Sequence, residues 1–401
     1  MRRVRTPERK PINIYEGTFD LKAKILECSL KDLDASINIC DLTSIINKFN
    51  DWKRLMPNVE PFYAIKCNDE LPVLETLLHL GSGVDCASLK EIEHVLNIGF
   101  KPDKILFANP MKNISHIEYA KANNVTDSTV DNEFEIYKIF QHYPESNAVL
   151  RFRSDALKAY RSFGKKFGCD AEEDGVALML VAKALGVNVN GVSFHVGSGC
   201  SDLYAYDRAI DTGSNLYKAG IMMKHKMELV DIGGGFPGHN DEMFCEIAEI
   251  VNEALKKYMS DVEAKIIAEP GRYFVSAAYT TICRVYSKRE LRDKDGELEK
   301  IMYYVNDGIY GTFNAIIFEK IKVDTIHFKD ENSKTYSSLI FGPTCDAADI
   351  LCDNIQLPNL KDGDFIAFPN TGAYTVTRSC GFNGFILPKT SYYIRKDMQL
   401  L

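Results

Sequence analysis

A regular alternation of short β-rich runs and amphipathic helical stretches between about residues 60 and 275 constrains the fold most strongly. In 241–259 apolar residues recur at helical spacing, and a second such stretch, 89–96, stops before Gly99, a common helix terminator. The pattern predicts a (β/α)₈ TIM-like barrel, which usually takes about 250 residues. A doubly wound open sheet remains the alternative, because periodicity does not show closure. The eight β-rich runs are 61–66, 83–87, 105–109, 127–131, 148–153, 191–196, 229–233 and 265–269.

After about residue 280 the pattern changes to short β-rich runs separated by turn residues, with little helix. This change predicts an α/β plus all-β protein whose second domain resembles a β-sandwich or β-barrel. We expect the barrel domain at 36–280 and the β domain at 1–35 together with 281–401. The β-rich runs of the second domain are 280–288, 300–306, 336–341, 364–368 and 385–388.

Composition excludes several classes of function. The net charge of −8 argues against nucleic-acid or anionic-membrane partners. No run of 18 apolar residues occurs, and no apolar stretch follows the basic first residues, so membrane insertion and secretion are not expected. The eleven cysteines contain no C-x-x-C pair, which fits reduced thiols in the cytoplasm and gives no reason to expect a metal site.

Polar or glycine residues stand at the carboxyl ends of most predicted strands, the ends that form the active-site face of such a barrel. A lysine at the end of the apolar run 62–65 would have its charged form disfavoured, and such amines form Schiff bases with carbonyls. On this position alone, a solvated surface lysine is the simpler interpretation. The polar or glycine residues at the ends of the predicted strands are Lys66, Asp85, Asn109, Asp131, Arg151, His195, 233–235 and Glu269.

Three further segments carry candidate ligands or nucleophiles. The triple glycine 233–235 lets backbone N–H groups approach a phosphate, although a tight turn explains it equally well. Glu269-Pro-Gly-Arg272 offers a second phosphate ligand or a local salt bridge. Cys345 follows a Gly-Pro turn, so its thiol can be accessible, but most free cysteines are inert core residues.

In joint order and spacing, these motifs resemble the ornithine decarboxylase family, the fold-type III pyridoxal-phosphate decarboxylases. The resemblance runs from about residue 61 to 385. It implies a carboxy-lyase that converts L-ornithine to putrescine in polyamine biosynthesis. Arginine or lysine decarboxylation is the alternative, and a non-catalytic regulatory homologue a further one. The segments that carry the resemblance are Phe62–Asp69, Val84–Ser88, His195–Cys200, 233–235, Glu269–Arg272, Tyr304–Gly311, Gly342–Asp346 and Gly372–Tyr374.

The resemblance assigns roles around pyridoxal 5'-phosphate. Lys66 would bind the cofactor aldehyde, with Asp85 beside the imine and Glu91 behind it. Glu269 would keep the pyridine nitrogen protonated, which makes the ring a strong electron sink. His195 would stack on the ring face. The other expected cofactor-binding residues are Arg151, Ser198, Gly234, Gly235, Gly271, Arg272 and Tyr374.

The resemblance also implies a homodimer with shared active sites. Cys345 of the second subunit would return a proton to Cα, and Asp346 would bind the distal ammonium of the substrate. The catalytic residues would then be Lys66, Asp85, His195 and Cys345. The expected substrate-binding residues are Asp346, Glu319, Phe318, Tyr310 and Phe382, and the expected dimer-interface residues are Lys166, Asp349 and Asn383.

The chain departs from the family pattern at the substrate side chain. Glu319 stands where ornithine decarboxylases usually have aspartate, and Phe318 where tyrosine is common. The extra methylene reaches about 1.3 Å further. The change from aspartate to glutamate shortens the substrate pocket if the backbone stays fixed. If the short helix that carries Glu319 moves outward, the same change admits arginine or lysine. The segment 114–137, where animal relatives bind a regulatory inhibitor protein, is not basic here, so we do not expect that binding.

Two rival classes fit less well. Non-catalytic relatives typically lose cofactor or catalytic residues, whereas this chain keeps them. Racemases of this type place a weak donor at the pyridine nitrogen, and Glu269 argues against that. The retained residues are Lys66, Glu269, Arg272, Cys345 and Asp346.

Overall fold

The computed structural model describes residues 10–28, 34–154, 156 and 166–399. Within this part, the chain divides into two compact units, one of residues 46–274 and one of residues 10–45 with 275–399. The barrel unit is therefore inserted between the two chain segments that build the β unit. We describe each unit by itself.

The barrel unit is a closed ring of eight parallel strands, which confirms the fold predicted from the alternation and excludes an open sheet. The strands follow one another in chain order, and β10 closes the ring by pairing with β3. Their bounds are β3 (Val59–Ala64), β4 (Gly83–Cys86), β5 (Ile105–Phe107), β6 (Asp127–Val130), β7 (Asn147–Arg151), β8 (Asn188–Ser193), β9 (Leu229–Asp231) and β10 (Lys265–Ala268).

Side chains fill the interior of the barrel. One buried cluster joins Phe62, Leu106, Val149 and Leu229, which come from the alternate strands β3, β5, β7 and β9, and it includes Ile267 of β10. Four side chains from alternate strands are the usual layer of such a barrel. The interior is therefore a packed core, and chemistry is confined to the strand ends.

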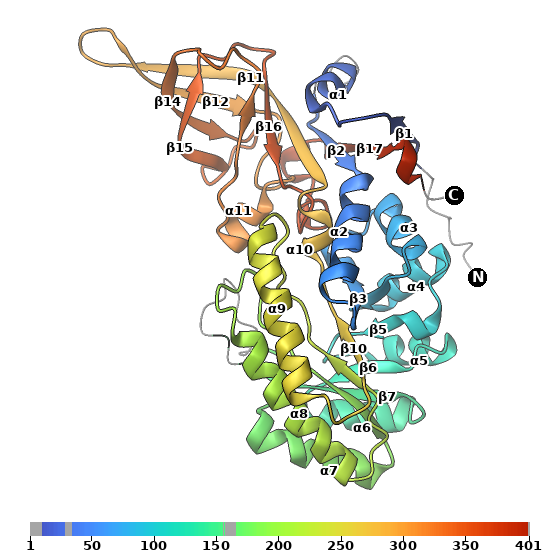
Figure 1. Ribbon diagram of the computed structural model, residues 1–401. Coiled ribbons are helices and arrows are strands. Elements are labelled where there is room, and N and C mark those ends of the chain that lie inside the picture. Colours follow the sequence, from blue (N-terminus) through green and yellow to red (C-terminus); the bar gives the residue numbers. More distant parts are fainter. Residues whose placement is uncertain (1–9, 29–33, 155, 157–165, 400–401) are drawn as a thin grey trace. The chain divides into compact units, whose positions relative to one another are not determined.

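Amphipathic helices cover the outside of the ring (Figure 1). The ends of α4 follow capping chemistry: the Ser88 side chain accepts the Glu91 N–H at its start, and Gly99, with φ of 117°, ends it. The helices are α2 (Leu42–Leu55), α3 (Leu71–His79), α4 (Leu89–Ile98), α5 (Ile114–Ala122), α6 (Glu133–His142), α7 (Val176–Leu185), α8 (Ala205–Met222), α9 (Asp241–Tyr258) and α10 (Arg272–Val275).

The second unit is mostly β, as predicted, with a nine-stranded sheet among its described residues. The long strand β11 pairs with β2 and β16 through its first half and with β12 through its second. The strands are β1 (Ile12–Tyr15), β2 (Ile37–Asp41), β11 (Tyr279–Arg292), β12 (Leu298–Val305), β13 (Ile326–His327), β14 (Thr335–Phe341), β15 (Ile350–Pro358), β16 (Phe365–Pro369) and β17 (Lys389–Arg395), and the helices are α1 (Leu21–Cys28) and α11 (Asn314–Glu319).

The first boundary of the β unit differs from the one expected at residue 36. Strand β2 pairs with β11 and β17, which both belong to the β unit, so residues 36–45 lie there and not in the barrel. Local periodicity carries no sign of a partner strand more than two hundred residues away in the chain. None of the helices in the described ranges combines the length and the apolar character needed to span a membrane.

Candidate active site

Lys66 and Asp85 meet at the carboxyl ends of adjacent strands of the barrel. Lys66 lies in a short 3₁₀ helix, Ile65–Cys67, directly after β3, and its ammonium binds Asp85 Oδ2 of β4. Asp85 is 1% exposed, and its Oδ1 has no hydrogen-bond partner within the described part of the chain. Glu91 accepts the Ala87 N–H and so holds the loop that follows β4. This pair leaves one buried acceptor available to a ligand.

Two buried carboxyl groups, Asp231 and Glu269, lie at the ends of the neighbouring strands β9 and β10. Burial, followed by the charge of Asp85, raises the pKa of Glu269 from 4.5 to about 7. Burial, followed by the charge of Glu269, raises the pKa of Asp231 well above its usual range. Two carboxyl groups that influence each other in this way cannot both ionise without cost. Asp231 Oδ1 accepts the Gly233 N–H at 2.8 Å.

His195 follows β8 and is held as a neutral imidazole. Its Nδ1 accepts the Gly197 N–H at 2.9 Å, which leaves the ring proton on Nε2. Burial lowers the pKa of His195 well below its usual value, and the cations Arg151 and Lys66 lower it further. Arg151, at the end of β7, also offsets the negative charge of Glu269 and Asp231.

The triple glycine is required by close packing. A Cβ at Gly234 would lie 2.6 Å from the Glu269 carbonyl oxygen and 2.8 Å from His195 Nε2. Gly235 has φ of 114°, a conformation that side-chain-bearing residues rarely adopt. The Arg272 guanidinium donates to Ser198 Oγ at 3.4 Å. Bare backbone, a hydroxyl and a guanidinium are groups that bind phosphate.

The barrel residues fit pyridoxal phosphate on their own geometry. Three carboxyl groups, Asp85, Asp231 and Glu269, are buried at this end of the barrel, and the cations Lys66 and Arg151 lower the pKa of Glu269 against the effect of burial. A ring nitrogen that carries a proton would add positive charge beside these carboxyl groups, and Asp85 Oδ1 is an acceptor without a donor in the described residues. The phosphate of the cofactor would fit beside the triple glycine 233–235 and Arg272.

In the β unit, Asp346 lies in a fixed polar cluster. The Tyr310 hydroxyl donates to Asp346 Oδ2, and the Ala348 N–H donates to Oδ1 at 2.9 Å. The Ala348 N–H, followed by Tyr310, lowers the pKa of Asp346, so this carboxylate is charged at neutral pH. Phe382 stacks on Tyr310 with ring centroids 4.2 Å apart.

Cys345 stands beside this cluster with an exposed side chain. Its backbone N–H donates to Asn383 Oδ1 at 3.0 Å. Asn383 has φ of 54°, a left-handed conformation that asparagine tolerates better than most residues. The structure thus groups the expected residues Tyr310, Cys345, Asp346, Phe382 and Asn383.

A second group of the β unit joins Glu319, Phe318 and Tyr374 through a residue that the sequence did not indicate, Arg378. Its guanidinium binds Glu319 Oε1 at 2.9 Å and lies 4.5 Å from the ring centre of Tyr374 and 5.9 Å from that of Phe318. Tyr374 has φ of 57°, which is rare for an aromatic residue and typical of functional sites.

Asp349 is 2% exposed, and groups of its own chain donate hydrogen bonds to both oxygens of its carboxylate. It accepts hydrogen bonds from Ile309 N at 2.9 Å, Thr344 N at 3.0 Å and Thr344 Oγ1 at 2.6 Å. It therefore braces the loop that leads to Cys345. Lys166 belongs to the barrel unit, where its ammonium lies 5.0 Å from the ring centre of Phe167. Their expected pairing between subunits stays a prediction.

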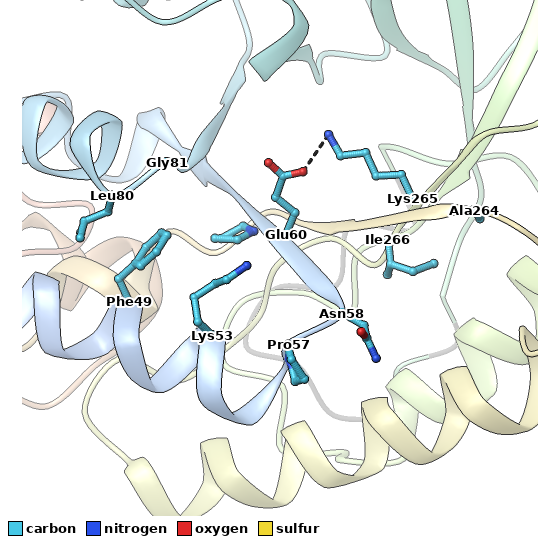
Figure 2. Close-up of a pocket in the computed structure, with 11 residues that line it drawn as sticks. Phe49, Lys53, Pro57, Asn58, Glu60, Leu80, Gly81, Ala264, Lys265 and Ile266 are labelled. Atoms are coloured by element: carbon cyan, nitrogen blue, oxygen red, sulfur yellow. Dashed lines mark ion pairs between the residues drawn. The ribbon is translucent and has the colours of Figure 1, made fainter.

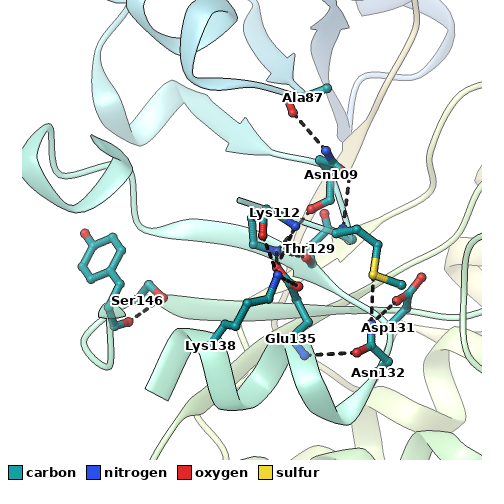
Figure 3. A network of polar contacts seen from close by, with 11 residues as sticks. Ala87, Asn109, Lys112, Thr129, Asp131, Asn132, Glu135, Lys138 and Ser146 are labelled. Carbon is teal, nitrogen blue, oxygen red and sulfur yellow. Dashed lines mark hydrogen bonds and ion pairs between the residues drawn. The ribbon is translucent and has the colours of Figure 1, made fainter. Parts of the chain in front are cut away.

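A buried ion network supports the barrel flank next to the site. The Lys112 ammonium binds Glu135 Oε1 at 2.9 Å and the Thr129 carbonyl at 2.6 Å, while Lys138 binds Glu135 Oε2 at 2.6 Å (Figure 3). Burial lowers the pKa of Lys112 from 10.5 to about 8, although Glu135 opposes the shift. The network ties the loop between β5 and α5 to helix α6.

The opposite end of the barrel has an open cavity of about 490 Å³ at the amino ends of β3 and β10 (Figure 2). Glu60 there binds Lys265 at 2.8 Å and also binds Lys104. These ion pairs link β3 to β10 and to the segment before β5 at the end of the barrel opposite the candidate site. Over the described ranges, no cluster of three or more His, Cys, Asp or Glu side chains is arranged to hold a metal ion.

Sequence reasoning gave no role to two residues of these groups, Asp231 and Arg378. Asp231 had a signal, because it stands two residues before the triple glycine, near the end of a predicted strand. Arg378 follows Tyr374 by four positions, a spacing too common to single it out. The carboxyl partner of Arg378, Glu319, is 59 residues away in the chain.

Comparison with known proteins agrees with this geometry. The chain matches the family described as pyridoxal-dependent decarboxylase, pyridoxal binding domain, over residues 42–276. It is 49% identical to ornithine decarboxylase 2 of Drosophila melanogaster, over 96% of this chain and 98% of that protein. It is 41% identical to antizyme inhibitor 2 of Xenopus laevis, over 93% and 85%. The structure of the Paramecium bursaria Chlorella virus arginine decarboxylase is similar with a TM-score of 0.87 and 33% identity, over 93% and 98%.

The closed barrel, its buried carboxyl groups and the match over 42–276 define a pyridoxal-phosphate-dependent carboxy-lyase. The chain belongs to the fold-type III pyridoxal-dependent decarboxylases, the family of the ornithine decarboxylases.

Proposed function

We propose that this carboxy-lyase removes the α-carboxyl group of L-ornithine and releases putrescine, a step of polyamine biosynthesis in the cytoplasm. One observation carries the reaction: the buried carboxyl pair Asp231 and Glu269 and the ion pair Lys66–Asp85 occupy the same end of the barrel. Electron-sink chemistry needs a carboxylate at the ring nitrogen and an amine at the aldehyde. These pairs supply both.

Each of these residues is assigned to one part of the cofactor. When bound, pyridoxal phosphate supplies an electron sink for the charge left on Cα as CO₂ departs. Lys66 holds the cofactor aldehyde, and Glu269 keeps the proton on the ring nitrogen. The neutral imidazole of His195 packs on the ring face without adding a competing charge. Gly234, Gly235, Ser198, Arg272 and Tyr374 anchor the phosphate.

The β unit provides the groups for the substrate. In a homodimer, the thiol of Cys345 of the partner subunit delivers a proton to Cα, and Asp346 of the partner subunit binds the distal ammonium. The accessible Cys345 side chain and the low pKa of Asp346 support these roles. A run of exposed apolar side chains supports a dimer that includes this segment: Phe382, Phe385, Ile386 and Leu387 are 41%, 42%, 61% and 40% exposed.

Two observations favour other functions. Glu319, with the likeness to a viral arginine decarboxylase, favours arginine as the alternative substrate, and lysine follows from the same chemistry. The likeness to antizyme inhibitor 2 favours a regulatory homologue, although Lys66, Glu269 and Cys345 are all present. The expectation against binding of a regulatory inhibitor protein, drawn from the composition of 114–137, stays a prediction.

Turnover on the three basic amino acids tests the proposal. CO₂ release by the purified holoenzyme gives kcat/KM for ornithine, lysine and arginine. We expect kcat/KM to be highest for ornithine. A preference for arginine or lysine would overturn the substrate while keeping the reaction class. Absence of CO₂ from all three, in protein that binds the cofactor, would favour the regulatory homologue.

A further inference from the structure

Arg378 is held in a cage formed by three side chains of the β unit. It ends a short 3₁₀ helix, Val376–Arg378, and its guanidinium lies 4.5 Å from the ring centre of Tyr374. The ring centre of Phe318 lies 5.9 Å from the guanidinium carbon, and Glu319 Oε1 accepts from Nη1 at 2.9 Å. The cation therefore contacts two aromatic faces and one carboxylate.

Glu319 is a buried carboxylate whose charge is offset by this partner. It is the last residue of α11 and is 7% exposed, so an uncompensated charge there would be costly. Arg378 is tethered to the same fold. It therefore acts as an intramolecular ligand at high effective concentration, and a diffusing substrate must compete with it.

Arg378 carries the same functional group, a guanidinium, as one of the alternative substrates, arginine. A guanidinium is planar, stacks on aromatic rings and binds carboxylates through a fixed fork, whereas an ammonium is a compact, strongly hydrated point charge. The guanidinium of free arginine would seek the same carboxylate and the same aromatic faces that Arg378 already uses. The ammonium of ornithine has no comparable need for the aromatic faces.

We infer that Arg378 is a specificity-determining residue that excludes arginine by occupying Glu319 with a guanidinium of the chain itself. Ornithine recognition then depends on Asp346, and Glu319 does not bind the distal group of the substrate. This inference rests on the proposed function, because it concerns which basic amino acid the same site accepts.

Four variants of the holoenzyme test the inference. Arg378→Ala removes the guanidinium that binds Glu319, and Glu319→Gln removes the negative charge that Arg378 binds. The double variant Arg378→Ala/Glu319→Gln removes both groups. Arg292→Ala is the matched control, since it deletes a surface guanidinium paired with Glu290 at 2.7 Å.

Two measurements are made on each variant. The first is the ratio of kcat/KM for arginine to that for ornithine. The second is the ratio of affinities for agmatine and putrescine, the amines of these two substrates, by titration calorimetry, which needs no turnover. We expect Arg378→Ala to raise both ratios about tenfold or more. The double variant should lose this gain, and Glu319→Gln and Arg292→Ala should leave both ratios near the wild-type value.

Three outcomes would overturn the inference. The ratios could stay unchanged in Arg378→Ala protein that binds the cofactor, the gain could persist in the double variant, or Arg378→Ala could lose cofactor affinity without any change of ratio. If Arg378→Ala does not fold, Arg378→Met, which keeps most of the aliphatic stem, replaces it. If the wild type releases CO₂ from none of the substrates, the proposed function fails, while the amine-affinity ratio still decides the role of Arg378.

Discussion

The buried carboxyl groups of Asp231 and Glu269 lie at the ends of the neighbouring strands β9 and β10, and the charge of Glu269 adds to burial in raising the pKa of Asp231. Burial is also the larger cause of the raised pKa of Glu269. Two carboxylates that influence each other in this way cannot both ionise without cost. The pair therefore places a titratable carboxyl group, Glu269, at the mouth of the barrel.

Cofactor-free enzyme should lose stability as the pH rises through 7. The pKa of Glu269 is raised in the folded state from 4.5 to about 7, so its contribution is present below pH 4.5 and lost as the pH rises through 7. At 1.36 kcal/mol per pKa unit, the loss is at most about 3 kcal/mol. Urea unfolding between pH 4 and 8 measures it.

The pH profile of the cofactor-free wild type is compared with the profiles of two variants and of the enzyme with bound cofactor. Glu269→Gln should flatten the pH profile, because the amide does not titrate. Asp231→Asn replaces the neighbouring carboxyl group by an amide of the same size that does not titrate, and it should keep most of the cofactor affinity. Bound pyridoxal phosphate should also flatten the profile by supplying positive charge beside Glu269. Parallel profiles for the wild type and Glu269→Gln would contradict this assignment.

Lys66→Ala should abolish the visible absorbance of bound cofactor and lower kcat by more than about a thousandfold. The reason is that no other amine is placed beside Asp85 in the described residues. Absorbance spectra and CO₂ release measure the two effects. Lys265→Ala, at the opposite end of the barrel (Figure 2), is the control and should retain both signals. A Lys66→Ala enzyme with full turnover would remove Lys66 from its role.

Cys345→Ala should bind cofactor normally but slow or misdirect the return of the proton to Cα. The expected sign is a fall in the yield of amine for each CO₂ released, measured by product chromatography after a fixed release of CO₂. Cys380→Ala, which removes another exposed thiol, is the matched control. A normal amine yield from Cys345→Ala would exclude the thiol as the proton donor.

Lys112→Met should destabilise the barrel by about 3–5 kcal/mol, the usual cost of removing one partner from a buried ion pair. The side chains of Lys112 and Glu135 are each 1% exposed, so neither charge can turn to water. Urea unfolding at neutral pH measures the change. The double variant Lys112→Met/Glu135→Leu should recover part of the loss, and strict additivity of the two single changes would argue against coupling.

Much of the barrel could be predicted because its causes are local. Alternating apolar runs set the strands, caps such as Ser88 and Gly99 set the helix ends, and parallel strands bring their carboxyl ends to one face. This reasoning placed Lys66, Asp85 and Glu269 at the strand ends, and their roles at the cofactor came from the family resemblance. Arg378 and the placement of β2 could not be found, because each depends on partners far away in the chain.

The pairing of β1 with β17 has a consequence for biosynthesis. Ile12 stands opposite Tyr392 in this ladder, so the two strands are separated by nearly the whole chain. During translation, β1 leaves the ribosome early but meets its partner β17 more than 370 residues later, after the barrel between them has been made. Strand β2 can pair with β11 soon after the barrel is complete, but its other edge also waits for β17. Until then these unpaired strand edges are exposed, and exposed edges invite misassembly with other nascent chains.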